Sequence, residues 1–221
     1  MSAAVFQSAL ARLVVDPDFR DGVCVRGAEA LPKDLSALER ERLLAVAVDR
    51  GLDITRTLHV GFRLAKLLAW IPLTCAVLGR EVRIREVGEF WKRRLPVSFY
   101  YLEEAVAFCD YILERAGEGL DVPYLEEVAA YERASLELRR ARPAGEPAAP
   151  QTVEFRHDPE ALLGALARGE ELGSLPEMPC RLVGRRVEDG VEWAFTAATS
   201  RKPAPPGPRR CGRRRTGRRG G

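Results

Sequence analysis

Residues 89–113 read EFWKRRLPVSFYYLEEAVAFCDYIL, and this stretch decides the fold. It holds seven aromatic residues, which are Phe90, Trp91, Phe99, Tyr100, Tyr101, Phe108 and Tyr111. Pro96 interrupts the stretch and Ser98 is a good helix N-cap. From residue 99 onward, apolar residues recur at spacings of three and four, which is typical of a helix with a wide buried face. We therefore predict a central bundle helix with Phe99, Leu102, Val106, Phe108 and Cys109 in the core.

Three aromatic side chains of this stretch, Trp91, Tyr100 and Tyr111, lie nearer the edges of the predicted apolar faces. Tyrosine and tryptophan are enriched at protein interfaces. Together with His157, placed in a predicted turn, they are our candidates for contact with a partner protein. Apolar residues at helical spacing usually face a core, so a purely structural helical protein stays open as an alternative.

The chain before this stretch is also helical by pattern. We predict a helix over 4–15 and interpret DPDFRDGV, residues 16–23, as a turn because Asp-Pro and Gly favour turns. SALE at 36–39 matches a capping box and opens a further helix. Pro72 removes a backbone donor and predicts a break in the long apolar helix that follows.

The C-terminal part changes its period. A strand, a short helix capped by Asp158 and a hairpin around Asp189-Gly190 predict a β-α-β-β order. The predicted fold class is α+β, mainly α-helical. Its predicted parts are a helical domain (1–141), a Pro-rich linker (142–151), a small α/β module (152–199) and a disordered Arg-rich tail (200–221).

Charge is divided unevenly along the chain. The residues from Arg201 onward include nine basic residues and no acidic one, whereas the rest has 26 basic against 32 acidic residues. The five cysteines form no C-x-x-C pair, which favours a reducing, cytoplasmic setting. The N-terminus lacks a signal-peptide pattern, and the most apolar run, residues 67–78, is too short to span a bilayer.

The residues indicate no catalytic chemistry. Only two histidines are present, His59 and His157, so we expect no metal site and no cofactor. Nucleophile and phosphate-binding motifs are missing as well. We interpret the acidic pairs Glu103-Glu104 and Glu126-Glu127 as solvated helix faces. The sequence thus predicts a protein that is not an enzyme.

Four motifs carry a resemblance to a known family over residues 4–197. They are IPLTCAVLGREV (71–82), FWKRRLPVSFYYLEEAVAFCDYI (90–112), VPYLEEVAAYERASLEL (122–138) and VEFRHDPEALLGALARGEEL (153–172). The chain resembles the partner subunits of multinuclear non-haem iron oxidative enzymes in ribosomal peptide natural-product biosynthesis, such as the methanobactin partner subunit. Members are often labelled DNA-binding domains. The basic tail departs from the family pattern.

The resemblance implies a non-catalytic accessory subunit with two partners. A separate iron-dependent enzyme would hold the metal, and the C-terminal module would bind the leader of a precursor peptide. An extended peptide can add to the open edge of a sheet as a strand. Our candidate edge residues are Arg181, Val183, Arg185 and Val187 on the first strand of the hairpin, with Glu192 and Trp193 on the second. The alternative is that the helical domain covers both edges.

A DNA-binding transcriptional regulator is the rival function. The tail supplies charge for non-specific nucleic-acid binding, although a solvated charge run is the commoner explanation.

Deletion of residues 201–221 tests this rival. The deletion removes nine positive charges, and salt-sensitive affinity scales with the number of neutralised phosphates. We expect duplex DNA binding, measured by fluorescence anisotropy at two salt concentrations, to vanish in the shortened chain. Selective binding of one duplex by the shortened chain at moderate salt would instead favour the regulator.

Overall fold

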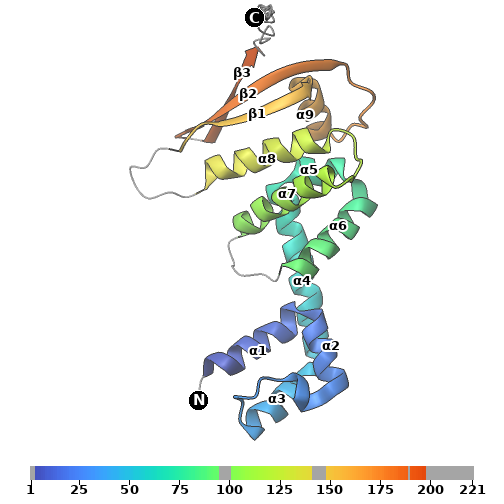
Figure 1. The fold of residues 1–221 in the computed structure, drawn as a ribbon, viewed down its shortest axis with the longest axis vertical. Helices are drawn as coiled ribbons and strands as arrows, with labels where there is room; N and C mark the ends of the chain where they lie inside the picture. The colour runs from blue at the N-terminus through green and yellow to red at the C-terminus, as the bar shows by residue number, and fades with distance from the viewer. Residues whose placement is uncertain (1–2, 95–100, 141–147, 189, 198–221) are drawn as a thin grey trace, which may run out of the picture.

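The computed structural model describes residues 3–94, 101–140, 148–188 and 190–197. Two groups of helices and a small sheet follow one another along the long axis (Figure 1). The helices precede a three-stranded antiparallel sheet that carries one helix of its own, so the predicted α+β class is confirmed. The linker 142–151 lies mostly outside the described residues, and the tail 200–221 lies wholly outside them.

The first helical group has its own hydrophobic cluster. It contains α1 (Ala3–Val15), α2 (Pro17–Arg26), the 3-10 helix η1 (Gly27–Ala30), α3 (Ala37–Ala47) and the start of α4 (Arg50–Trp70). Leu13, Leu43 and Leu52 are among its buried residues. The capping box is confirmed, because Ser36 Oγ accepts from the Glu39 amide and Glu39 accepts from the Ser36 amide.

The interpretation of residues 16–23 as a turn was wrong, because they form most of α2. Asp16 is the N-cap, accepting from the Phe19 amide at 2.9 Å, and Pro17 occupies the first helical position. An Asp-Pro pair starts a helix as readily as a turn. The burial of Phe19 and Val23 decided between the two, and that burial comes from tertiary packing.

The second helical group is centred on α7 (Tyr101–Gly117). Around it lie α5 (Pro72–Val77), α6 (Gly79–Arg93) and α8 (Leu125–Arg139). Val106, Phe108 and Cys109 are buried in its cluster, as predicted, and the predicted break at Pro72 separates α4 from α5. Leu102 is only partly buried but packs against the same cluster. The proposed cap Ser98 and residue Phe99 lie outside the described residues.

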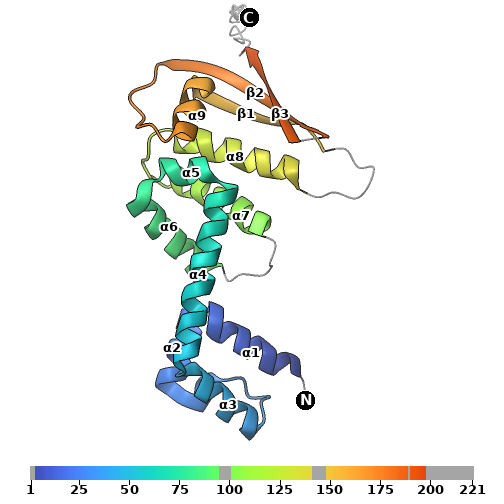
Figure 2. The same cartoon turned by 180° about the vertical axis from the view of Figure 1, so that it is seen from behind.

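The sheet lies on the second helical group. Its strands are β1 (Gln151–His157), β2 (Glu177–Val187) and β3 (Gly190–Ala197), in that order, with α9 (Pro159–Arg168) connecting the first two. One face packs on α8 through Val153, Phe155 and Leu182 (Figure 2). The opposite face carries mainly polar residues, as expected for an antiparallel sheet covered on one side.

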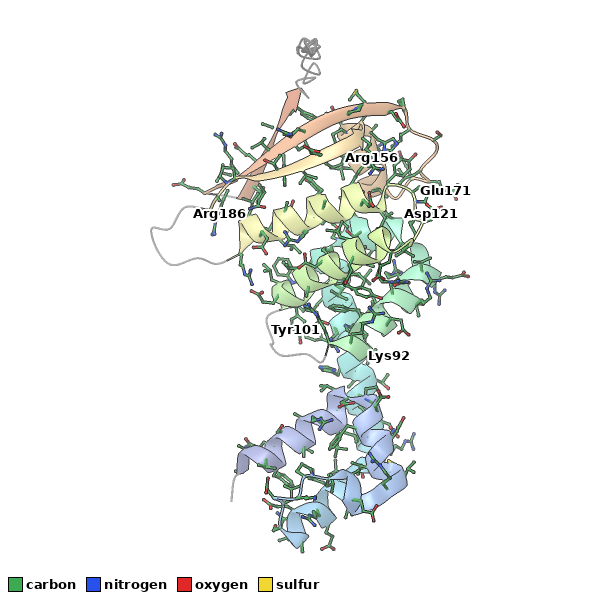
Figure 3. All side chains as sticks on the ribbon, in the orientation of Figure 1. Lys92, Tyr101, Asp121, Arg156, Glu171 and Arg186 are labelled. Atoms are coloured by element: carbon green, nitrogen blue, oxygen red, sulfur yellow. The ribbon has the colours of Figure 1, made fainter. Side chains whose placement is uncertain are left out.

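The predicted hairpin is present, with its loop shifted by one residue. The strand β2 ends at Val187, and Gly190 already pairs with Val187 and begins β3. Residue 189 lies outside the described residues. Gly190 has φ of 154°, a value that side chains rarely adopt. Near the turn of the hairpin, the guanidinium of Arg186, labelled in Figure 3, donates to the Arg140 carbonyl at 3.0 Å. This contact links the hairpin to the residue after α8.

Within the described residues, the helices are all too short or too polar to cross a bilayer.

Gly184 provides a test of how the sheet packs on α8. A Cβ atom there would lie 2.8 Å from the Trp193 ring and 2.9 Å from Leu138 of α8. We expect Gly184→Ala to lower the free energy of unfolding by about 1–3 kcal/mol, because the inserted methyl group overpacks this contact. Urea denaturation followed by circular dichroism measures the change.

Gly88→Ala is the matched control for this substitution. Gly88 lies inside α6, where a Cβ atom meets nothing within 4 Å, so alanine should raise helix stability slightly. An unchanged midpoint for Gly184→Ala would show that the sheet does not pack on α8 as described.

Candidate functional site: a groove beside the free edge of β3

The edge assigned to β2 from the sequence was wrong, because β2 is the central strand. Arg181 and Val183 have β1 on one side and β3 on the other. Arg185 lies past Gly184, where the pairing of β2 with β1 stops, but it still pairs with Glu192 of β3. The sequence could not give this order, because a strand, a helix and a hairpin allow the first strand to join either side of the hairpin.

Within the part of the chain that the structure describes, β3 pairs only with β2, so the free edge on the hairpin side is β3. A two-residue loop closes on a hydrogen-bonded pair, here Val187 with Gly190, and such pairs alternate along an antiparallel ladder. Arg185 and Glu192 therefore bond to each other. The amide and carbonyl groups of Val191, Trp193 and Phe195 point away from β2 and lie along the free edge. Of these, only Trp193 was named from the sequence.

A groove of about 420 Å³ runs beside this edge. Its lining is mostly apolar and comes from β2, β3, α8, α9 and the start of α5. The main lining residues are Leu73, Tyr131, Pro159, Leu163, Trp193 and Phe195. The Trp193 ring lies 4.9 Å from the Tyr131 ring, whereas Phe195 is 59% exposed although it faces the same side as the sheet core. The edge and the groove thus share Trp193 and Phe195.

The other edge, β1, has a different chemistry. By the same alternation, the backbone groups of Thr152, Glu154 and Arg156 point outward there. Their side chains are polar. Glu154 forms an ion pair with Arg181 at 2.7 Å, and Arg156 forms one with Glu126 at 3.3 Å. Charged residues on an edge discourage strand addition, so β3 is the better edge for a ligand.

The aromatic residues predicted to dock a partner are mostly engaged inside the protein. Tyr111 is only 7% exposed and donates to Glu86 at 2.9 Å, so its predicted place on a surface was wrong. Burial, together with this hydrogen bond, raises the pKa of Tyr111. Trp91 is half-buried, and its indole N–H donates to Glu104 at 2.7 Å. Tyr100 lies outside the described residues.

His157 sits apart from Trp91 and Tyr111, at the end of β1. Its Nδ1 lies 2.8 Å from a Glu127 oxygen, and its ring packs edge-on against Tyr124. These residues border a second hollow, near Arg156 and Asp121 in Figure 3. The structure therefore does not gather the predicted docking residues into one surface.

The interpretation of both acidic pairs as solvated helix faces was wrong in part. Glu104 is nearly buried and accepts from the buried guanidinium of Arg63 at 2.9 Å. Glu127 is buried against His157, whereas its neighbour Glu126 stays exposed. The sequence holds no sign of these partners, because Arg63 is 41 positions away from Glu104 along the chain.

Two of the cysteines, Cys75 and Cys109, are buried in the second helical group. Burial raises the pKa of the Cys75 thiol to about 12, and burial also raises the pKa of Cys109. Across residues 3–94, 101–140, 148–188 and 190–197, no three histidine, cysteine or acidic side chains converge as metal ligands would. The groove beside β3 offers backbone pairing and apolar contact.

No model of a known protein family matches the chain, and no curated protein matches it. The groove itself was missed from the sequence. Its residues come from five elements whose proximity is set by the packing of α8 and α9.

Thiol labelling tests whether Cys75 and Cys109 are buried while Cys24 is exposed. At pH 8, iodoacetamide should modify the exposed Cys24 quickly and leave Cys75 and Cys109 unmodified, because burial keeps their thiols protonated and covered. Peptide mass mapping before and after denaturation gives the result. Rapid native labelling of Cys109 would show that the α7 core opens.

Proposed function

We propose that the protein is a non-catalytic partner subunit that binds an extended peptide along β3. One observation carries the proposal: Trp193 and Phe195 supply both the free backbone edge and part of the apolar groove beside it. A peptide added to β3 would gain main-chain hydrogen bonds at the edge. Every second side chain of that peptide would face the groove.

The shape and chemistry of the groove favour particular peptides. Its walls are aromatic and aliphatic, with Glu160 as the charged member of the lining. A strand with apolar residues at alternate positions therefore fits, and an acidic residue facing Glu160 would be disfavoured. A proline in the paired segment would remove an amide donor and weaken binding.

The resemblance of the sequence to partner subunits of iron-dependent oxidative enzymes suggests what the peptide and the second partner are. The ligand would be the leader of a ribosomally made precursor. The oxidation would belong to a separate iron-dependent enzyme that this chain docks. This division of labour fits a described region whose acidic residues and thiols are used for packing and ion pairs.

Nucleic-acid binding remains the second candidate function, supported by the nine basic residues after Ser200. Those residues lie outside the described region, and the groove beside β3 has no basic lining. The two functions therefore use different parts of the chain and can be separated by deletion of the tail.

A proline substitution at Phe195 tests strand addition. Phe195→Pro and Phe195→Ala both remove the ring, but only proline also removes the amide that faces the free edge. We expect the proline variant to bind the leader peptide of a neighbouring precursor gene at least ~10-fold more weakly than the alanine variant. Isothermal titration measures both affinities. Equal affinities for the two folded variants would exclude β3 as the pairing edge.

Ala194→Pro is the control for this test. The Ala194 amide points toward Val183, so proline there breaks the hairpin itself and should lower the melting temperature. Proline at Arg185 or Glu192 would have the same structural effect, because these residues also pair across the hairpin. Circular dichroism on all variants separates loss of binding from loss of fold.

A further inference from the structure

The middle of α4 is largely exposed to solvent. Between the buried residues Leu52 and Arg63, every residue is exposed or only half-buried. Figures 1 and 2 show α4 running between the two helical groups with its central turns uncovered by other helices. A helix in this position would ordinarily be polar on its outer face.

The outer face of α4 is apolar instead. Ile54, Leu58 and Phe62 follow each other at intervals of four and are 54%, 68% and 49% exposed. Ala65, three residues after Phe62, and Ala69, four further on, continue the same row, because residues three and four apart are neighbours on one face of a helix. We call these five residues the α4 ridge. An exposed apolar row of this length is typical of an interaction surface.

Gly61 supports close approach by another backbone. It lies inside α4 and beside the α4 ridge, and a Cβ atom there would meet nothing within 4 Å. Glycine inside a helix costs about 0.5–1 kcal/mol relative to alanine. The missing side chain leaves room at this exposed position for the backbone of a neighbouring helix.

Charge selects the kind of neighbour. The helix α4 carries four basic residues and the single acid Asp53, which is engaged by Arg20. Two of the basic residues are used within the chain, because Arg63 is buried against Glu104 and Arg56 donates to the Leu13 carbonyl. The cations beside the α4 ridge are therefore Arg50, which is exposed, and Lys66, which flanks Phe62. A second copy packed antiparallel about Leu58 would place Arg50 against Lys66 of the other copy, and these charges repel.

We infer that the α4 ridge docks an amphipathic helix of a partner protein, with acidic residues beside its apolar face. Apolar side chains of the partner pack along Ile54, Leu58 and Phe62, and its backbone approaches at Gly61. The acidic flanks lie near Arg50 and Lys66. This surface is separate from β3, since α4 and β3 belong to different hydrophobic clusters.

Two synthetic helices of about 20 residues test this inference. Both carry leucine along one face; one has glutamate on the flanks and its twin has lysine there. Fluorescence anisotropy with the full chain should show at least ~10-fold tighter binding of the glutamate helix. Leu58→Glu should abolish that binding, because it places an acid in the middle of the α4 ridge. Equal binding of the twins, or retention by Leu58→Glu, would overturn the inference.

Val25→Glu is the matched control. Val25 is 85% exposed on α2, away from the α4 ridge, so this variant should bind the glutamate helix like the unaltered chain. Equal loss in both variants would overturn the inference, since it would indicate a general charge effect. Light scattering coupled to gel filtration measures whether the chain forms a dimer. A dimer that Leu58→Glu dissociates would replace the partner helix with a second copy.

Discussion

A buried carboxylate on α8 fixes the centre of the protein. Glu132 accepts from the backbone amides of Leu73 at 2.9 Å and Thr74 at 2.7 Å, so it caps the N-terminus of α5 from a distant helix. Burial raises the pKa of Glu132, while the two amides act in the opposite direction. The six-residue α5 begins at Pro72 and has no side-chain cap from its own N-cap residue, Ile71. Its first turn therefore depends on α8 for hydrogen bonds.

The position of α8 in turn decides where the sheet lies. One side of this helix contributes Leu125, Ala129 and Leu136 to the helical cluster. The other side contributes Val128 and Ala134 to the cluster beneath the sheet. A sheet of three strands buries little surface by itself, so it needs this second layer. The groove beside β3 exists because α8 and α9 support the sheet at that edge.

Buried charges hold the remaining helices in one arrangement. Arg63, Glu104 and Trp91 join α4, α7 and α6, and the Arg63 guanidinium lies 4.4 Å from the Trp91 ring. Glu86 of α6 accepts from Tyr111 and Arg115 of α7 in the same way. Removing one member of a buried ion pair costs about 3–5 kcal/mol, because its partner is left unpaired. These contacts engage Trp91 and Tyr111 within the protein, while the surfaces that we propose for partners lie on β3 and α4.

The sequence by itself determined the secondary structure of most of the chain. Local chemistry was sufficient for the capping box at Ser36, the break at Pro72, the apolar periodicity of α7 and the cap at Asp158. Such signals act between residues a few positions apart. Only the tertiary structure decided that residues 16–23 form a helix and that Tyr111 is buried. It also decided that Glu104 is paired and that β2 lies between β1 and β3. Each of these depends on contacts between segments far apart in the chain. The periodicity of apolar residues shows which face of a helix or strand is buried, but it does not show which other segment covers that face.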